Sequence, residues 1–84
     1  MKLSVYSIQS TLFDGEAEKV IARTTTGEIT ILDNHVPLIS SLLPQNVRFI
    51  DKEHKEHTIN ISFGFLEVKP ESETVILVEA GNKL

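Results

Sequence analysis

Two histidines and two carboxylates gather in one short segment and are the first candidates for chemistry. His54 and His57 lie among Glu53 and Glu56, and zinc accepts both imidazole and carboxylate ligands. No third histidine and no cysteine lies nearby, and two lysines in the same segment would repel a cation. The pattern favours a solvated turn over a metal site, and we expect neither a metal nor another cofactor.

A second candidate is the tripeptide Asp33-Asn34-His35 with Ser40 or Ser41 after it. These residue types could form a hydrolytic triad, in which a carboxylate orients the imidazole that activates a serine. However, the sequence has no Gly-x-Ser-x-Gly elbow and no Gly-x-x-x-x-Gly-Lys phosphate loop. The tripeptide, close before a proline, is also typical of a polar turn. We therefore expect no catalytic residues and no enzymatic activity of the chain alone.

Composition narrows the classes of partner. The chain has 84 residues, a net charge of −4 and no cysteine, which excludes a disulfide framework and disfavours a surface that follows nucleic-acid phosphates. No continuous apolar run of membrane-spanning length occurs, so we expect no insertion into a membrane. The composition therefore favours a protein as the binding partner.

The elements that position these residues are predicted to be strands. Apolar residues recur at every second position, which is typical of strands with one buried face. Glu18–Thr25 and the segments around Ile29, Val47 and Phe49 show this alternation. We interpret the run from Ile59 to Phe65 as one long strand with four large apolar groups on one side: Ile59, Ile61, Phe63 and Phe65. The last run, Val75–Val78, is apolar at every position, which predicts a strand covered on both faces.

Turn residues separate these strands. The pairs Asp14-Gly15 and Thr26-Gly27 predict tight hairpins. The polar segments Asp51–Glu56 and Pro70–Glu73 predict two further loops between strands. The segment Val36–Leu43 has helical spacing, but prolines bracket it, so we interpret it as a strand.

These patterns predict one all-β domain over residues 1–84, an antiparallel β-sandwich of about eight to ten short strands. Gly64 interrupts a bulky strand, which is more typical of a bulge or a close backbone approach than of a binding site.

Three stretches together resemble the epsilon subunit of F-type ATP synthases, which is called delta in mitochondria. They arrive in that family's order and spacing: Leu12–Val20 with its Phe-Asp-Gly, Thr26–Ile39 with its Gly-Glu and His-x-Pro-Leu, and Ser62–Pro70 with its Gly-x-Leu-Glu-Val. The resemblance covers residues 2 to 80 and implies the amino-terminal β-sandwich of that family.

The resemblance implies a non-catalytic rotor subunit of a proton-translocating ATP synthase. It implies a monomer within the complex that couples the gamma subunit to the membrane c-ring, at the cytoplasmic face of a bacterial cell membrane. The c-ring contact it implies involves Glu28 and His35, with Pro37 and Leu38 shaping the loop and Ser7 near the same end of the domain. Asp33-Asn34 stands where the family often has Pro-Gly, and Phe63 where it often has Gly.

The family usually continues into a two-helix carboxy-terminal arm that inhibits ATP hydrolysis, and this sequence lacks that helical hairpin after Ala80. The resemblance therefore implies a subunit without that inhibition. Two other hypotheses remain from the residues alone: an unrelated β-sandwich scaffold or protein-interaction module, and more remotely a hydrolase built on Asp33 and His35.

Overall fold

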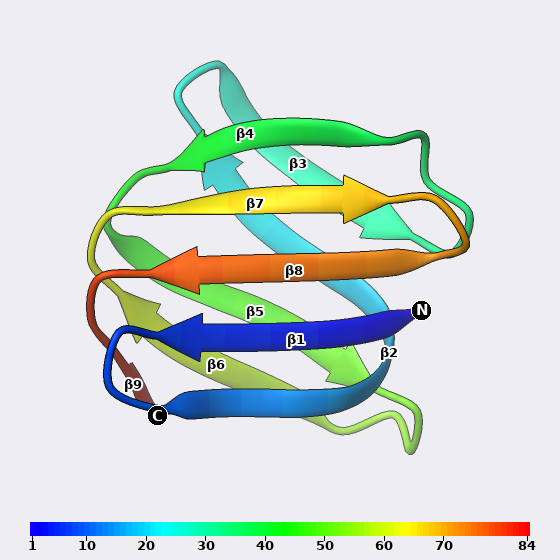
Figure 1. The fold of residues 1–84 in the computed structure, drawn as a ribbon. Coiled ribbons are helices and arrows are strands. Elements are labelled where there is room, and N and C mark those ends of the chain that lie inside the picture. The colour runs from blue at the N-terminus through cyan, green and yellow to red at the C-terminus, as the bar shows by residue number, and fades with distance from the viewer.

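The computed structural model describes residues 1–84 and consists of strands and turns without an α-helix (Figure 1). The nine strands are β1 (Lys2–Ser7), β2 (Thr11–Thr24), β3 (Gly27–Leu32), β4 (Leu38–Leu42), β5 (Gln45–Asp51), β6 (Glu56–Ile61), β7 (Gly64–Lys69), β8 (Glu73–Val78) and β9 (Gly81–Lys83). The predicted all-β class and strand number are confirmed, and so is the strand predicted within Val36–Leu43.

The strands form two layers, which Figure 1 shows one behind the other. The front sheet contains β4, β7, β8, β1 and the first half of β2, and the back sheet contains β3, the second half of β2, β5, β6 and β9. All pairings are antiparallel except that of β1 with β8, which is parallel. The expected sandwich is therefore present, with one parallel pair that the sequence did not predict.

Strand β2 belongs to both sheets. Its first half pairs with β1 and its second half with β3 and β5. The β2–β5 register shifts between Ala17 and Lys19, and an irregularity of this kind bends a strand so that it can pass from one sheet to another.

The hairpin predicted at Asp14-Gly15 is wrong, because both residues lie inside β2. They pair with Ser4 and Leu3 of β1. A Cβ at Gly15 would lie 3.2 Å from the Phe13 ring, so the glycine provides room for that ring rather than a turn.

The core lies between the two sheets, where alternate residues of every long strand point inward. Seventeen buried apolar residues form one cluster: Met1, Leu3, Val5, Leu12, Ala17, Val20, Ala22, Ile31, Leu42, Val47, Phe49, Ile59, Ile61, Leu66, Val68, Ile76 and Val78. The period of two therefore identified the buried face of β2, β3 and β5 correctly.

Three of the four predicted turns are confirmed. Gly27 has a φ of 130° and follows the two-residue turn between β2 and β3, which a glycine adopts without steric cost. The β5–β6 turn joins Asp51 to Glu56, and the β7–β8 turn contains two residues of positive φ, Glu71 and Ser72.

The prediction of one long strand from Ile59 to Phe65 is wrong. A bend at Ser62 and Phe63 ends β6 and starts β7, and it changes which alternate residues point inward. Ile59 and Ile61 are buried, whereas Phe63 and Phe65 are exposed.

Gly64 is buried at this bend. A Cβ there would lie 2.5 Å from the Leu77 carbonyl oxygen. The expected close backbone approach is confirmed.

The prediction that Val75–Val78 is covered on both faces is also wrong. Ile76 and Val78 point into the core, but Leu77 is 52% exposed and Val75 is only partly buried. No element of the described chain lies over the outer face of the front sheet, so this strand has one apolar side in solvent.

Candidate protein-interaction site

The five residues expected at the site fall at two ends of the sandwich. Glu28 lies at the start of β3, beside the β2–β3 turn, and His35 lies in the loop after β3. A strand rises about 3.3 Å per residue, so the six residues of β3 separate the two ends by roughly 17 Å. The structure therefore does not bring Glu28 and His35 together.

Ser7 lies at the end of the domain that contains Glu28. A row of paired residues crosses the front sheet from Ser7 to Thr24 through Val78, Gly64 and Leu42. Thr24 in turn pairs with Gly27, the neighbour of Glu28. Pro37 and Leu38 lie with His35 at the opposite end. The expectation that Ser7 lies near the end of His35 is wrong, because the full length of β1 separates Ser7 from that end.

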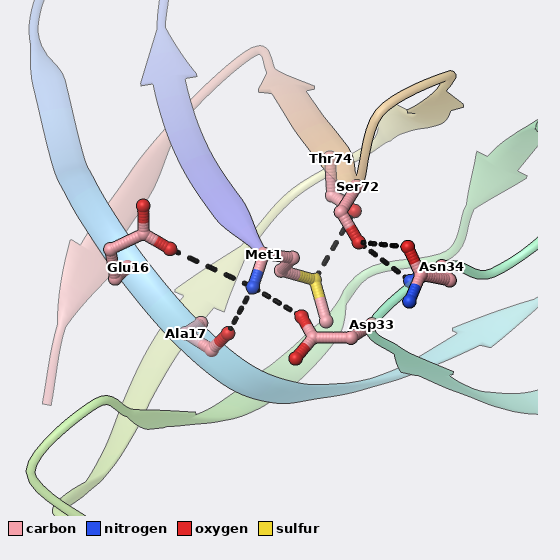
Figure 2. Close-up of polar contacts among 7 residues, drawn as sticks. All are labelled: Met1, Glu16, Ala17, Asp33, Asn34, Ser72 and Thr74. Carbon is pink, nitrogen blue, oxygen red and sulfur yellow. Dashed lines mark hydrogen bonds and ion pairs between the residues drawn. The ribbon is translucent and has the colours of Figure 1, made fainter.

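The loop that carries His35 is held at its first two residues. Asn34 has a φ of 62°, a left-handed conformation that asparagine tolerates without glycine's freedom. Its backbone N–H donates to the Ser72 hydroxyl oxygen over 2.6 Å (Figure 2). The His35 ring lies close to its own chain, with Nδ1 2.7 Å from the Val36 carbonyl oxygen.

The α-ammonium of Met1 anchors the same loop from the other side. It donates to the Asp33 carboxylate and, over 2.9 Å, to the Ala17 carbonyl oxygen. The Glu16 carboxylate lies 3.7 Å away, and Figure 2 shows these groups converging on one nitrogen. The Met1 side chain is buried. The ammonium attaches the loop to the start of β1 and to β2, and the hydrogen bond from Asn34 to Ser72 attaches it to the β7–β8 turn.

These contacts leave no assembled hydrolytic triad. The Asp33 carboxylate is bonded to the Met1 ammonium rather than to an imidazole. The Ser40 hydroxyl donates to the Ser41 carbonyl oxygen over 3.3 Å. Because each group is engaged with a different partner, the geometry gives no support to a hydrolase.

The two histidines of the β5–β6 segment also separate. His54 Nδ1 lies 2.9 Å from a Glu18 carboxylate oxygen, and His57 Nε2 lies 2.7 Å from a carboxylate oxygen of Asp51. The His57 ring stacks on Phe49, with centroids 4.8 Å apart and an interplanar angle of 3°. The two histidines therefore bond to different carboxylates.

Asp51 organises this turn. Its carboxylate accepts the backbone N–H groups of Glu53 and Lys55 over 2.8 and 3.0 Å. The hydrogen bond from His57, followed by that from Lys55, holds the pKa of the Asp51 carboxyl below its ordinary value. A turn stabilised by its first residue is a structural role.

Sequence reasoning missed an apolar groove on the front sheet. Phe65 and Leu77 pair across β7 and β8 and are 58% and 52% exposed. Ile8 and Phe63 lie at the same end and are 78% and 66% exposed. Together these four residues line a groove of about 430 Å³. The sequence did not predict that Leu77 is exposed, because a continuous apolar run does not reveal which face of a strand is covered.

An exposed apolar surface of this kind on a monomer commonly marks a site of protein association. The structure contains no helix that is long and apolar enough to cross a membrane. The fold and this surface define a small β-sandwich with an apolar groove on the outer face of one sheet.

The chain belongs to the family of the β-sandwich domain of the ATP synthase delta/epsilon chain, whose model matches residues 1–82. It is similar to the ATP synthase epsilon chain of Shouchella clausii, with 39% identity over 99% of this chain and 61% of that protein. It is also similar to that of Desulfosudis oleivorans, with 35% identity over 99% of this chain and 62% of that protein. The chain thus spans about three fifths of the length of these curated relatives.

Solved structures share the fold. One chain in the mitochondrial ATP synthase of Euglena gracilis, solved as OSCP, F1 and c-ring, superposes with a TM-score of 0.92 at 20% identity, over 99% of this chain and 52% of that chain. A chain from the central stalk and c-ring of Tetrahymena thermophila gives 0.81 at 15% identity, over 98% and 65%. Family membership removes the alternative of an unrelated scaffold.

Proposed function

We propose that this chain is a non-catalytic rotor subunit of an F-type ATP synthase, which joins the gamma subunit to the membrane c-ring during ATP synthesis. Family membership supports the assignment. The solved chains of the same fold come from complexes described as containing the c-ring or the central stalk. The proposed location is the cytoplasmic face of a bacterial membrane, with one copy in each proton-translocating complex.

The observation that carries this proposal is the apolar groove of the front sheet. Ile8, Phe63, Phe65 and Leu77 expose large apolar side chains on one surface. Burial of apolar area provides most of the favourable free energy of a stable protein interface, and central aromatic residues often dominate it. We assign this surface to the gamma subunit.

The c-ring then contacts one end of the sandwich, for which two candidates exist. One end contains Ser7 and Glu28, and the other contains His35, Pro37 and Leu38. We favour the end with Glu28, because the exposed residues of the β2–β3 turn there are hydroxyl-bearing and charged. Polar loops of a partner can hydrogen-bond with such residues without burying unpaired groups.

The test is co-purification of the tagged chain with the ATP synthase of its own cells. We expect one copy per complex, and we expect the pair of changes Phe65→Ser and Leu77→Ser to lower the bound fraction at least tenfold. Leu32→Ser is the matched control, because Leu32 is 54% exposed on the other sheet. Equal losses from both sets of changes, or normal assembly of the double variant, would contradict the assignment of the groove.

A further inference from the structure

A second groove lies on the outer face of the back sheet and is polar. It has a volume of about 310 Å³, and its charged lining residues are Arg23, Glu28 and Arg48. The two arginines are notable because the chain as a whole carries a net charge of −4. This surface is separate from the apolar groove, which lies on the front sheet.

The strand register places the two arginines as diagonal neighbours. Arg48 pairs with Ile21, and Arg23 lies two residues further along β2 on the same outward face. Diagonal neighbours on one face of a sheet are about 7 to 8 Å apart, which long side chains can span. Both guanidinium groups can therefore reach one ligand between them.

Neither guanidinium is neutralised within the chain. The ion pairs of the described chain involve only the Met1 ammonium, His54 and His57 as cations. Glu28 stands directly opposite Arg23 in the β2–β3 register and still forms no ion pair with it within 4.0 Å. The two arginines thus present free donors toward solvent.

The backbone beneath Arg23 is held by the side chain of Gln45. The Gln45 carboxamide accepts the Arg23 N–H over 2.6 Å and donates to the Arg23 carbonyl oxygen over 2.7 Å. The same amide nitrogen lies 2.8 Å from the Leu43 carbonyl oxygen, to which it also donates. A groove whose backbone is fixed before binding loses less conformational entropy when a ligand arrives.

We propose that this groove binds a single carboxylate side chain of an extended segment on a protein partner. Guanidinium groups bind carboxylates through paired, charge-assisted hydrogen bonds. Glu28 in the same groove repels a dianionic phosphate or a polyanion, but it can accept a backbone N–H of a peptide. The groove shares Glu28 with the end of the sandwich that we propose for the c-ring. The binding of a carboxylate by the two arginines goes beyond that assignment, and it is tested on the isolated chain, apart from assembly of the complex.

The test is an NMR titration of the full 84-residue chain with a capped Gly-Gly-Glu-Gly-Gly peptide, with the glutamine analogue as the matched ligand. We expect saturable shifts of the Arg23 and Arg48 side-chain Nε–H signals and of the amides around Gln45 with the glutamate peptide only. Equal shifts with the glutamine peptide, or no saturable shifts, would overturn the proposal.

Substitutions locate the site. An exposed charge pair contributes about 0.3 to 1 kcal/mol, so Arg23→Gln or Arg48→Gln should each weaken peptide binding roughly 2- to 5-fold. The double variant should lose saturable binding. Lys2→Gln is the control of equal charge change, on the front sheet, and it should leave the affinity unchanged. An equal loss in the control would mean diffuse attraction rather than a site.

Two further ligands separate the possible sources of the anion. Inorganic phosphate and vesicles of phosphatidylglycerol should each bind more weakly than the glutamate peptide. Glu28→Gln should increase phosphate binding, because it removes the repelling carboxylate. Tighter binding of phosphate or of vesicles by the unmodified chain would overturn the assignment to a peptide.

Discussion

The outer faces of the two sheets differ although their inner faces are built alike. Both inner faces supply apolar residues to one core. The outer front face exposes Phe65 and Leu77, whereas the outer back face exposes Arg23 and Arg48. Because folding requires only that the inner faces be apolar, the difference between the outer faces reflects what each surface contacts. The inner residues therefore determine stability, and the outer faces provide the two surfaces that we propose for association.

The sharpest test of this comparison uses two adjacent residues of β8. Ile76 is fully buried and Leu77 is 52% exposed. Ile76→Ala should lower the free energy of unfolding by about 2 to 5 kcal/mol, because it leaves a cavity, while Leu77→Ala should change it by about 0.5 kcal/mol or less. Urea denaturation measures both. Similar losses for the two variants would show that Leu77 belongs to the core.

A substitution at Gly64 tests how closely the backbone of β8 approaches this position beside the apolar groove. A Cβ at this position meets the Leu77 carbonyl oxygen at 2.5 Å and Val78 Cγ1 at 2.8 Å. Gly64→Ala should destabilise the fold by about 1 to 3 kcal/mol through overpacking. Gly15→Ala is the control, since its closest contact is a side-chain ring at 3.2 Å, and it should cost less. A smaller loss for Gly64→Ala than for the control would contradict the close approach.

The two ends of the sandwich can be compared by substituting one residue at each. Glu28→Ala and His35→Ala should each leave folding intact. Glu28→Ala should weaken ring association by about 1 kcal/mol or less, as expected for a polar rim contact. The measurement is coupled proton pumping after reconstitution. Because we place the ring at the end with Glu28, only that variant should reduce coupling, and a reduction from His35→Ala alone would move the contact to the other end.

The smallest effect concerns pH and the turn between β5 and β6 of the back sheet. The pKa of Asp51 is lower in the folded chain than in the unfolded chain. Its contribution to stability is therefore present above the unfolded-state pKa and is lost as the pH falls through the folded-state pKa. Asp51→Asn should lower the urea midpoint at pH 7, and the difference from the unmodified chain should shrink toward pH 2. A difference that stayed constant over this range would exclude the carboxylate as its cause.

The sequence predicted the buried faces of β2, β3 and β5 because their apolar residues alternate with polar ones. It failed where the outer face is also apolar. At Val75–Val78 nothing in the residue types separates Leu77 from its buried neighbours, and between Ile61 and Phe65 a two-residue bend changes the inward set while the apolar spacing continues. The apolar groove formed by these residues was missed for the same reason.

The candidate site was predictable as residues but not as an arrangement. The resemblance supplied Glu28 and His35 as parts of one contact, with six residues between them. The intervening segment is instead an extended strand, which separates the two residues. The polar groove was beyond sequence reasoning because its two arginines come from β2 and β5, and only the strand register makes them neighbours.

Strand β2, shared by both sheets, has a mechanical consequence. Hydrogen bonds in a strand pair lie perpendicular to the strands. A force along β2 therefore shears its hydrogen bonds to β1, β3 and β5, and all of these bonds share the load at the same time. Such bonds must break together, whereas bonds pulled at right angles to the strands break one after another. A load applied along β2 is therefore resisted by both sheets at once, a property that suits the rotor role proposed above.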